Sequence, residues 1–200
     1  MTTTGIKFTV KASDTLEIDL VRRAQDGNQG AFSKLMDLYR ERIYRLIYHM
    51  VGSLDDSHDL CQETFVRAYR ALNTFDPQRP FKPWIYRIAN NVILDHFRQK
   101  KVRPTLAEPN PEQPFEETAP DLNAEEPLMA LVSEETRDRV WSAIQALPEN
   151  YKNVVLHRYV DDLSYAEIAE TLGLTVQNVM MRMSRARQIL RERLQYLQIG

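Results

Sequence analysis

Hydrophobic residues recur at helical spacing through most of this chain, and no segment of useful length alternates with the period of a β-strand. Breaks such as Asp26-Gly27-Asn28 and Gly52-Ser53 separate the periodic stretches, because these residue types end one helix or begin the next. The sequence therefore predicts an all-α fold. Ahead of residue 163 it predicts helices over about 14–25, 29–50, 54–72, 82–101, 128–146 and 148–159.

The stretch 163–193 has the pattern of a helix-turn-helix. Ser164 and Glu167 can form a capping box, and Gly173 supplies the left-handed residue that a tight turn needs. Thr175 can cap the second helix, whose apolar positions are Val176, Val179, Met183, Ala186 and Leu190. The other faces of this helix are basic, as in a recognition helix. A plain helical hairpin with a solvated arginine face is the alternative interpretation.

The helix predicted over 54–72 combines an apolar face with a charged one. The positions expected to face inward are Leu54, Cys61, Phe65, Ala68, Tyr69 and Leu72. Acidic residues in the first turns and arginines near the end suit the helix dipole, so the charged face can be a solvated surface. A surface that binds a partner explains the same pattern, and the residues alone leave both readings open.

The loop 73–81 and the helix after it bring basic, amide and aromatic side chains together. Such a set can hold single-stranded nucleic acid, because cations neutralise phosphate and flat rings stack on bases. On or beside the outer side of this helix we place Arg87, Asn90, Asn91 and Arg98. Ordinary core packing is the competing reading for the aromatic residues, and it is stronger for Trp84 and Phe97 than for Phe75.

Charge divides the chain into three parts. Residues 1–103 hold 17 basic and 12 acidic side chains, residues 104–135 hold nine acidic and no basic ones, and residues 136–200 hold nine basic and seven acidic ones. Six prolines and few apolar residues in 104–127 cannot form a core. We therefore expect two small helical domains, 14–103 and 128–200, a flexible acidic linker over 104–127 and a loose tail over 1–13.

Several classes of protein are disfavoured by what the sequence lacks. The single Cys61 excludes a disulfide framework, and the four histidines show no metal-ligand spacing. There is no phosphate-binding loop, dinucleotide fingerprint or nucleophile motif, and neither a membrane-spanning run nor a signal peptide. We expect no catalytic residue, no metal, no cofactor and a cytoplasmic protein.

Two segments resemble bacterial sigma factors of the extracytoplasmic-function (ECF) group of the sigma-70 family. The first segment resembles region 2 of these proteins and reads DDSHDLCQETFVRAYRALNTFDPQRPFKPWIYRIANNVILDHFRQKK. The second segment resembles region 4 and reads LPENYKNVVLHRYVDDLSYAEIAETLGLTVQNVMMRMSRARQILRERL. The order of the two segments and the variable linker between them fit this group, which lacks the long region 3 of primary sigma factors.

The resemblance implies roles for particular residues. Binding to the coiled coil of the largest RNA polymerase subunit is implied for Asp59, Gln62, Glu63 and Arg67. Binding of the opened −10 element is implied for Phe75, Arg79, Arg87, Asn90, Asn91, Arg98 and Lys101. Binding of the −35 element is implied for Thr175, Gln177, Asn178, Met181, Arg182 and Arg185. Region 4 would also touch the polymerase flap, and an anti-sigma factor would mask one or both modules.

The chain departs from the family pattern at two places. Family recognition helices often carry a small residue, then Lys and Ser, where this chain has Asn178, Met180 and Met181. Asn90 stands where arginine is frequent. The −35 preference of the family is therefore not carried over. We expect a sigma factor that directs RNA polymerase core to specific promoters and helps to melt the −10 region. The alternative is a conventional helix-turn-helix regulator with an N-terminal effector or dimerisation domain.

Overall fold

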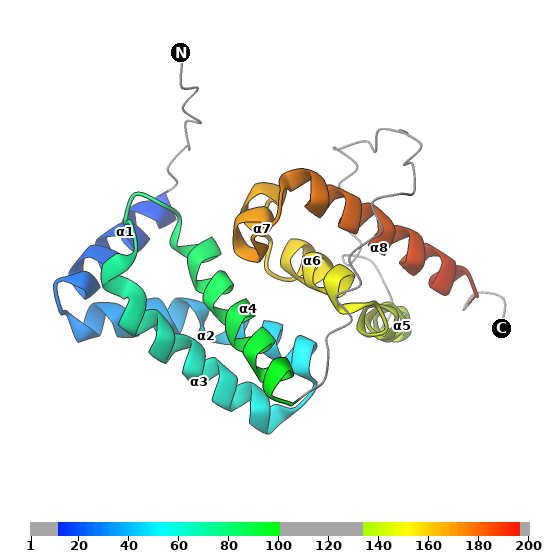
Figure 1. Cartoon of the computed structure of the whole chain (residues 1–200), viewed down its shortest axis with the longest axis horizontal. Coiled ribbons are helices and arrows are strands. Elements are labelled where there is room, and N and C mark those ends of the chain that lie inside the picture. Colours follow the sequence, from blue (N-terminus) through cyan, green and yellow to red (C-terminus); the bar gives the residue numbers. More distant parts are fainter. Residues whose placement is uncertain (1–11, 101–133, 197–200) are drawn as a thin grey trace, which may run out of the picture.

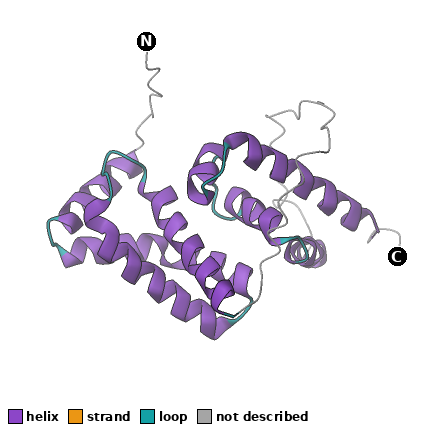
Figure 2. Ribbon diagram, in the orientation of Figure 1, coloured by secondary structure: helices purple, strands orange, loops and turns teal. Residues whose placement is uncertain are grey.

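A computed structural model describes residues 12–100 and 134–196, and within these ranges it contains helices and short connections but no strand (Figure 2). The α-helices are α1 (Ala12–Gln25), α2 (Gln29–Val51), α3 (Leu54–Ala71), α4 (Phe81–Gln99), α5 (Glu134–Gln145), α6 (Glu149–Tyr159), α7 (Tyr165–Leu172) and α8 (Val176–Tyr196). A short 3₁₀ turn, η1 (Leu72–Thr74), follows α3. The all-α prediction is confirmed, whereas the expected linker 104–127 lies outside the described residues.

The first module is a bundle in which α2 packs against α1 and α3, and α3 packs against α4 (Figure 1). One face of α2 is buried along the length of the helix, with Ile43 and Ile47 completely inaccessible. The ends of α2 follow local chemistry. The side chain of Asn28 accepts a hydrogen bond from the Ala31 amide at 3.0 Å, and Gly52 ends the helix in the left-handed conformation.

The inward face of α3 is narrower than the sequence predicts. Cys61, Phe65 and Ala68 are buried as expected, but Leu54 is 61% and Tyr69 is 49% exposed. Leu54 is the first residue of α3, and the Tyr69 ring lies at the border of the buried face, in a T-shaped contact with Phe32 at 5.0 Å between ring centroids. The prediction that both side chains face inward was wrong, because helical spacing does not show how far the neighbouring helices cover a face.

The second module contains α5–α8, and its α8 packs across α5, α6 and α7 (Figure 1). Its core includes the fully buried Val154, Ile168 and Val179. The predicted apolar stripe of α8 is confirmed at Val179, Met183, Ala186 and Leu190, whereas Val176, the first residue of the helix, is 43% exposed.

The two modules contact each other directly. Helix α4 lies against α7, and α2 approaches α6 (Figure 1). At this junction the imidazole of His49 on α2 packs edge-on against Trp141 on α5, with ring centroids 4.2 Å apart. Helix α4 is therefore covered on two sides, by its own bundle and by the second module.

Candidate nucleic-acid interface

Helices α7 and α8 form the predicted helix-turn-helix. The Ser164 hydroxyl accepts a hydrogen bond from the Glu167 amide at 3.3 Å, and the Glu167 carboxylate accepts one from the Ser164 amide at 2.8 Å. Gly173 has a φ of 67°, which glycine adopts at little cost. The Thr175 hydroxyl accepts from the Asn178 amide at 3.2 Å and so begins α8. The capping box, the glycine turn and the Thr175 cap are all confirmed.

The first turn of α8 presents polar side chains to solvent. Thr175, Gln177 and Asn178 are exposed, while Met181 and Arg182 are half-buried further along the helix. A recognition helix reads base edges with residues near its N-terminus, so this exposed turn can enter a major groove. The predicted −35 residues from Thr175 to Arg182 thus lie at the N-terminal end of α8, and Arg185 follows further along the helix.

The arginines further along α8 differ in what they contact. Arg185 donates a hydrogen bond to Gln188 at 3.4 Å within the helix. Arg187 instead reaches the hydroxyls of Tyr159 at 3.0 Å and Tyr165 at 3.4 Å, on α6 and α7. Because Arg187 joins three helices, its role in the module is structural. The sequence pattern by itself did not separate it from the other arginines of α8.

The loop before α4 is built around a buried aromatic cluster. Phe75 is 7% exposed, and its ring centroid lies 5.6 Å from that of Phe81 and 4.9 Å from that of Trp84. Gln25 on α1 donates hydrogen bonds of 2.8 Å to the carbonyls of Leu72 and Phe75. Core packing therefore accounts for Phe75, and Gln25 is a positioning residue for this loop that the sequence reading missed.

Helix α4 carries one exposed row of polar residues. Arg87, Asn91 and Arg98 are exposed and share one face, because their spacings of four and seven residues return to the same side of a helix. Arg98 donates to the Asp95 carboxylate at 3.2 Å. Lys101 lies outside the described residues.

Asn90 differs from these residues. Sequence reasoning placed Asn90 on or beside the outer side of α4, but the structure leaves it only 4% exposed. Its amide nitrogen lies 2.9 Å from Nε2 of His157, on the second module. The placement at the surface was wrong because the outer side of α4 is itself a packing surface. Arg79 is likewise engaged across the junction, in an ion pair with Glu170.

On α3 the predicted polymerase-binding residues fall into two groups. Asp59 and Gln62 are exposed. Arg67 donates to Glu63 at 2.8 Å and to Asp95 on α4 at 2.7 Å, so it ties α3 to α4. The hydrogen bond from Arg67 holds the pKa of Asp95 below its usual range.

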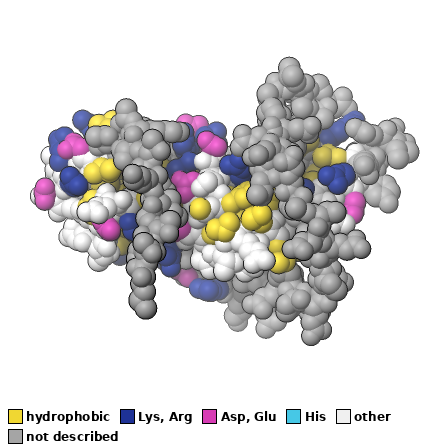
Figure 3. All heavy atoms as spheres, turned by 90° about the horizontal axis from the view of Figure 1, so that it is seen from above, with side chains coloured by type: hydrophobic (Ala, Val, Ile, Leu, Met, Phe, Trp, Pro, Cys, Tyr) yellow, Lys and Arg dark blue, Asp and Glu magenta, His cyan; other side chains and the backbone are white. Residues whose placement is uncertain are grey.

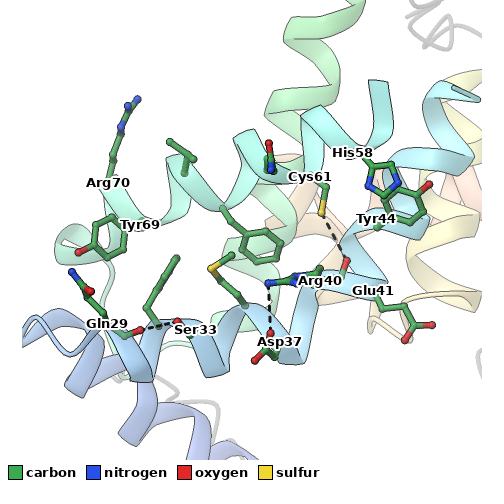
Figure 4. Close-up of a pocket in the computed structure, with 15 residues that line it drawn as sticks. Gln29, Ser33, Asp37, Arg40, Glu41, Tyr44, His58, Cys61, Tyr69 and Arg70 are labelled. Atoms are coloured by element: carbon green, nitrogen blue, oxygen red, sulfur yellow. Dashed lines mark hydrogen bonds and ion pairs between the residues drawn. The ribbon is translucent and has the colours of Figure 1, made fainter. Parts of the chain in front are cut away.

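A groove of about 1120 Å³ lies between α2 and α3. Figure 4 shows Tyr44 and His58 together at one end of this groove and Tyr69 and Arg70 toward the other. Phe32, Met36 and Phe65 give it an apolar lining, while Gln62 and the exposed Val66 also border it. The groove therefore joins an apolar surface to the side of α3 that carries Gln62.

No helix in the described ranges is long and apolar enough to cross a membrane. Among the described side chains, no group of three or more His, Cys, Asp or Glu residues could hold a metal ion.

Comparison with known families matches both modules. The model of sigma-70 region 2 matches residues 35–103, and that of sigma-70 region 4 matches residues 137–190. The first match begins within α2 and runs through α4, and the second covers α7 and most of α8. The fold and these matches define a protein of the sigma-70 class.

Comparison with individual proteins narrows this class. The chain is 34% identical to the ECF RNA polymerase sigma factor SigW of Bacillus subtilis over 181 residues, which are 88% of this chain and 96% of SigW. It is also 34% identical to the ECF sigma-E factor of Escherichia coli K12, over 89% of this chain and 94% of that protein. The chain belongs to the ECF RNA polymerase sigma factors.

A solved structure supports the same architecture. CnrH, in complex with the cytosolic domain of CnrY, matches with a TM-score of 0.67 and 26% identity, over 90% of this chain and 98% of CnrH. The helical fold is thus shared over nearly the full length of CnrH.

Proposed function

We propose that this sigma factor binds RNA polymerase core, directs it to specific promoters through −10 and −35 contacts, and helps to melt the −10 region. The observation that carries the proposal is the presence of both sigma regions, in order, in a chain that covers almost the whole length of its relatives. The region 2 match also disfavours the alternative, a conventional helix-turn-helix regulator, because it accounts for the N-terminal module without an effector domain.

In the second module the exposed end of α8 would read the −35 element. The amide groups of Gln177 and Asn178 can pair with adenine, and the guanidinium of Arg182 can pair with guanine. Thr175 would order the backbone at this end through its cap. Met181 can contact a thymine methyl, and Arg185 is placed to hold a phosphate and set the register.

In the first module the exposed row of α4 would hold the opened −10 strand. Arg87 and Arg98 can neutralise phosphates, and Asn91 can pair with a base edge. The loop around Phe75 to Arg79 would capture an unstacked base, with the buried Phe75 shaping the loop. Lys101, which follows the described part of α4, belongs to the same proposed surface.

The polymerase would dock on α3. Asp59 and Gln62 are exposed there, and the groove beside Gln62 supplies apolar area that a helical partner can bury. Glu63 and Arg67 would hold this side of α3 in place through the contact with Asp95. Region 4 would in addition touch the polymerase flap.

The remaining parts of the proposal follow from the family. The protein would have no catalytic activity of its own and would work in the cytoplasm, with module boundaries near 14–103 and 128–200. CnrH was solved with a protein partner, the cytosolic domain of CnrY. We extend the expectation of such a partner, an anti-sigma factor, to this chain.

The test is reconstitution with purified core polymerase. Run-off transcription from genomic promoter fragments should appear only when the full chain is added, and the mapped start sites should share −10 and −35 sequences. Co-purification with core should accompany this activity. Duplex DNA binding without core association or transcription would instead favour the regulator and overturn the proposal.

A further inference from the structure

The loop between α3 and α4 contains a hydrogen-bonded turn. Directly after η1 the backbone of Phe75 is extended, with φ −78° and ψ 133°, and its amide donates to the Leu72 carbonyl at 3.0 Å. The Asp76 carbonyl then accepts from the Arg79 amide at 3.0 Å, and the Asp76 carboxylate accepts from the Gln78 amide at 2.9 Å. Aspartate at the first position stabilises a turn in this way. The turn is therefore closed by its own hydrogen bonds.

An aromatic cluster lies under this turn. The buried ring of Phe75 packs against Phe81 and Trp84, and the Phe81 ring centroid lies 5.5 Å from that of Tyr39 on α2. The Tyr39 hydroxyl in turn donates to the carboxylate of Glu17 on α1. Helix α1 thus contacts the side chains on which the loop rests.

Gln25, at the end of α1, holds the backbone of the loop. Its amide nitrogen donates to the carbonyls of Leu72 and Phe75, each at 2.8 Å, although these residues lie 47 and 50 positions further along the chain. A glutamine amide has two N–H donors, so one side chain can serve both carbonyls. Leu72 begins η1 and Phe75 follows it, and Figure 1 shows the loop beside α1. Gln25 therefore fixes both ends of η1 relative to α1.

The outer side of the loop carries polar groups that suit a nucleic-acid base. Asn73 and Gln78 are exposed there, and each amide offers donors and an acceptor to a base edge. Lys and Arg side chains lie on the face of the first module seen from above (Figure 3). Unstacking a base costs a few kcal/mol, which contacts in the capturing site must offset. A loop that must also become ordered on binding loses part of that energy.

We infer that Gln25 is a positioning residue for base capture, which holds the loop in the conformation that takes one unstacked base of the −10 strand. This inference rests on the proposed function, because the captured base belongs to that strand. Gln25 acts through the loop and sets the discrimination at a single position of the strand. It precedes residue 35, where the match to region 2 begins, so helix α1 supplies this support from outside the matched segment.

Variants of Gln25 separate positioning from general stability. Gln25→Met keeps the length of the side chain and removes both donors. Gln25→Lys keeps N–H donors and is the conservative variant that should retain the position of the loop. Gln145→Met is the matched control, since it makes the same change at an exposed position of α5. Gln25→Glu removes the donors from a side chain of the same shape, and so tests the contact should Gln25→Met fail to fold.

The packing of the loop without DNA is the first measurement. The chain has two tryptophans, Trp84 and Trp141, and Trp141→Phe leaves Trp84 as the reporter. The Trp84 ring centroid lies 4.9 Å from that of Phe75, so its fluorescence responds when the loop loosens. In this background Gln25→Met and Gln25→Glu should raise the quenching of Trp84 by acrylamide. Gln25→Lys and Gln145→Met should keep the quenching of the parent.

Binding of a labelled single strand is the second measurement, made by fluorescence anisotropy with holoenzyme reconstituted from core polymerase and the full chain. The probe is the non-template −10 strand of a promoter mapped by the run-off experiment, with one base at a time replaced by an abasic site. In the parent, the abasic site at the captured position should weaken binding most. Gln25→Met should weaken binding of the intact strand about tenfold and abolish the abasic loss at that position alone.

The ratio of intact to abasic affinity is the decisive quantity. It removes any uniform effect of the charge that Gln25→Lys adds, and this variant should keep the ratio of the parent at every position. Gln145→Met should keep it as well. A merely structural role of Gln25 would weaken binding of all strands by one common factor and leave the ratios unchanged.

The outcomes separate this inference from the proposed function. If the parent supports transcription but Gln25→Met keeps the abasic loss at the captured position, or no position is sensitive in the parent, the inference alone is overturned. Unchanged quenching of Trp84 in both Gln25→Met and Gln25→Glu also overturns it. If the parent holoenzyme neither binds the strand nor supports transcription, the proposed function fails, and base capture fails with it even where the quenching responds.

Discussion

Single side chains along α8 differ in what they contact, and these differences decide which of them are open to the proposed −35 element. The Thr175 hydroxyl caps the helix by accepting from the backbone amide of Asn178. The side-chain amides of Gln177 and Asn178 are exposed, so they can reach a DNA groove. Arg187, in contrast, is held within the module, because its guanidinium donates to two tyrosine hydroxyls on α6 and α7. Neighbouring arginines of one helix therefore have different roles, and each needs its own test.

Arg182→Ala should weaken binding to the −35 duplex by about 1–3 kcal/mol if the side chain reads a base. The loss should be confined to the cognate sequence and shrink when the contacted base pair is changed. Fluorescence anisotropy with cognate and altered duplexes measures it, and Arg191→Ala, on the exposed distal part of α8, is the matched control. An equal loss on every duplex would contradict base reading and mark a phosphate contact.

At the scale of helices, α3 serves both its own bundle and the proposed polymerase surface. Arg67 bridges Glu63 and Asp95, so changing either acid disturbs the packing of α3 on α4 as well as the surface charge. These side chains are more than one-third exposed, and pairs of this kind contribute at most about 1 kcal/mol. Asp59 is exposed and lies on the same helix, so changing it alters the surface charge without removing the contacts of Arg67 with Glu63 and Asp95.

Asp59→Lys should impair association with core polymerase while leaving the helix content unchanged. The physical reason is that reversal of an exposed charge at a docking surface opposes the partner's field without removing a buried contact. Co-sedimentation with core and circular dichroism measure the two effects. Asp19→Lys on α1 carries the same charge change and should retain core binding; equal impairment by both variants would point to net charge instead of a site.

At the scale of the whole molecule, the junction between modules includes a titratable ring. His49 on α2 packs against Trp141 on α5, and burial, with a smaller effect of Arg45, holds the pKa of His49 below its usual 6.5. The unfolded chain therefore takes up a proton at His49 more readily than the folded chain does. By linkage, the stability from this group is complete above about pH 6.5 and is lost as pH falls toward the lowered pKa.

Urea unfolding followed by tryptophan fluorescence should accordingly show a falling free energy of unfolding between about pH 7.5 and about pH 5.5. His49→Gln should reduce this slope, because glutamine does not titrate. His58→Gln, at an exposed position of α3, should keep it. A slope that is the same in all three proteins would assign the pH dependence to other groups.

The sequence by itself determined the all-α fold and the local construction of most helices. Helical periodicity located α2, α4 and α8, and short-range chemistry placed the Ser164 box and the Gly173 turn. These features depend on residues within one or two turns of each other, so they can be read directly from a chain. The exposed end of α8, including Gln177 and Asn178, follows from the same local information.

Only the tertiary structure decided which polar side chains are exposed to solvent. Asn90 has the polar character of a surface residue, yet it is buried against His157, 67 positions away in the chain. Phe75 is enclosed by Phe81 and Trp84, and the loop that holds it is tied to α1 by Gln25. Periodicity marks the face of a helix that needs burial, but a second covered face, such as that of α4, depends on how distant segments pack.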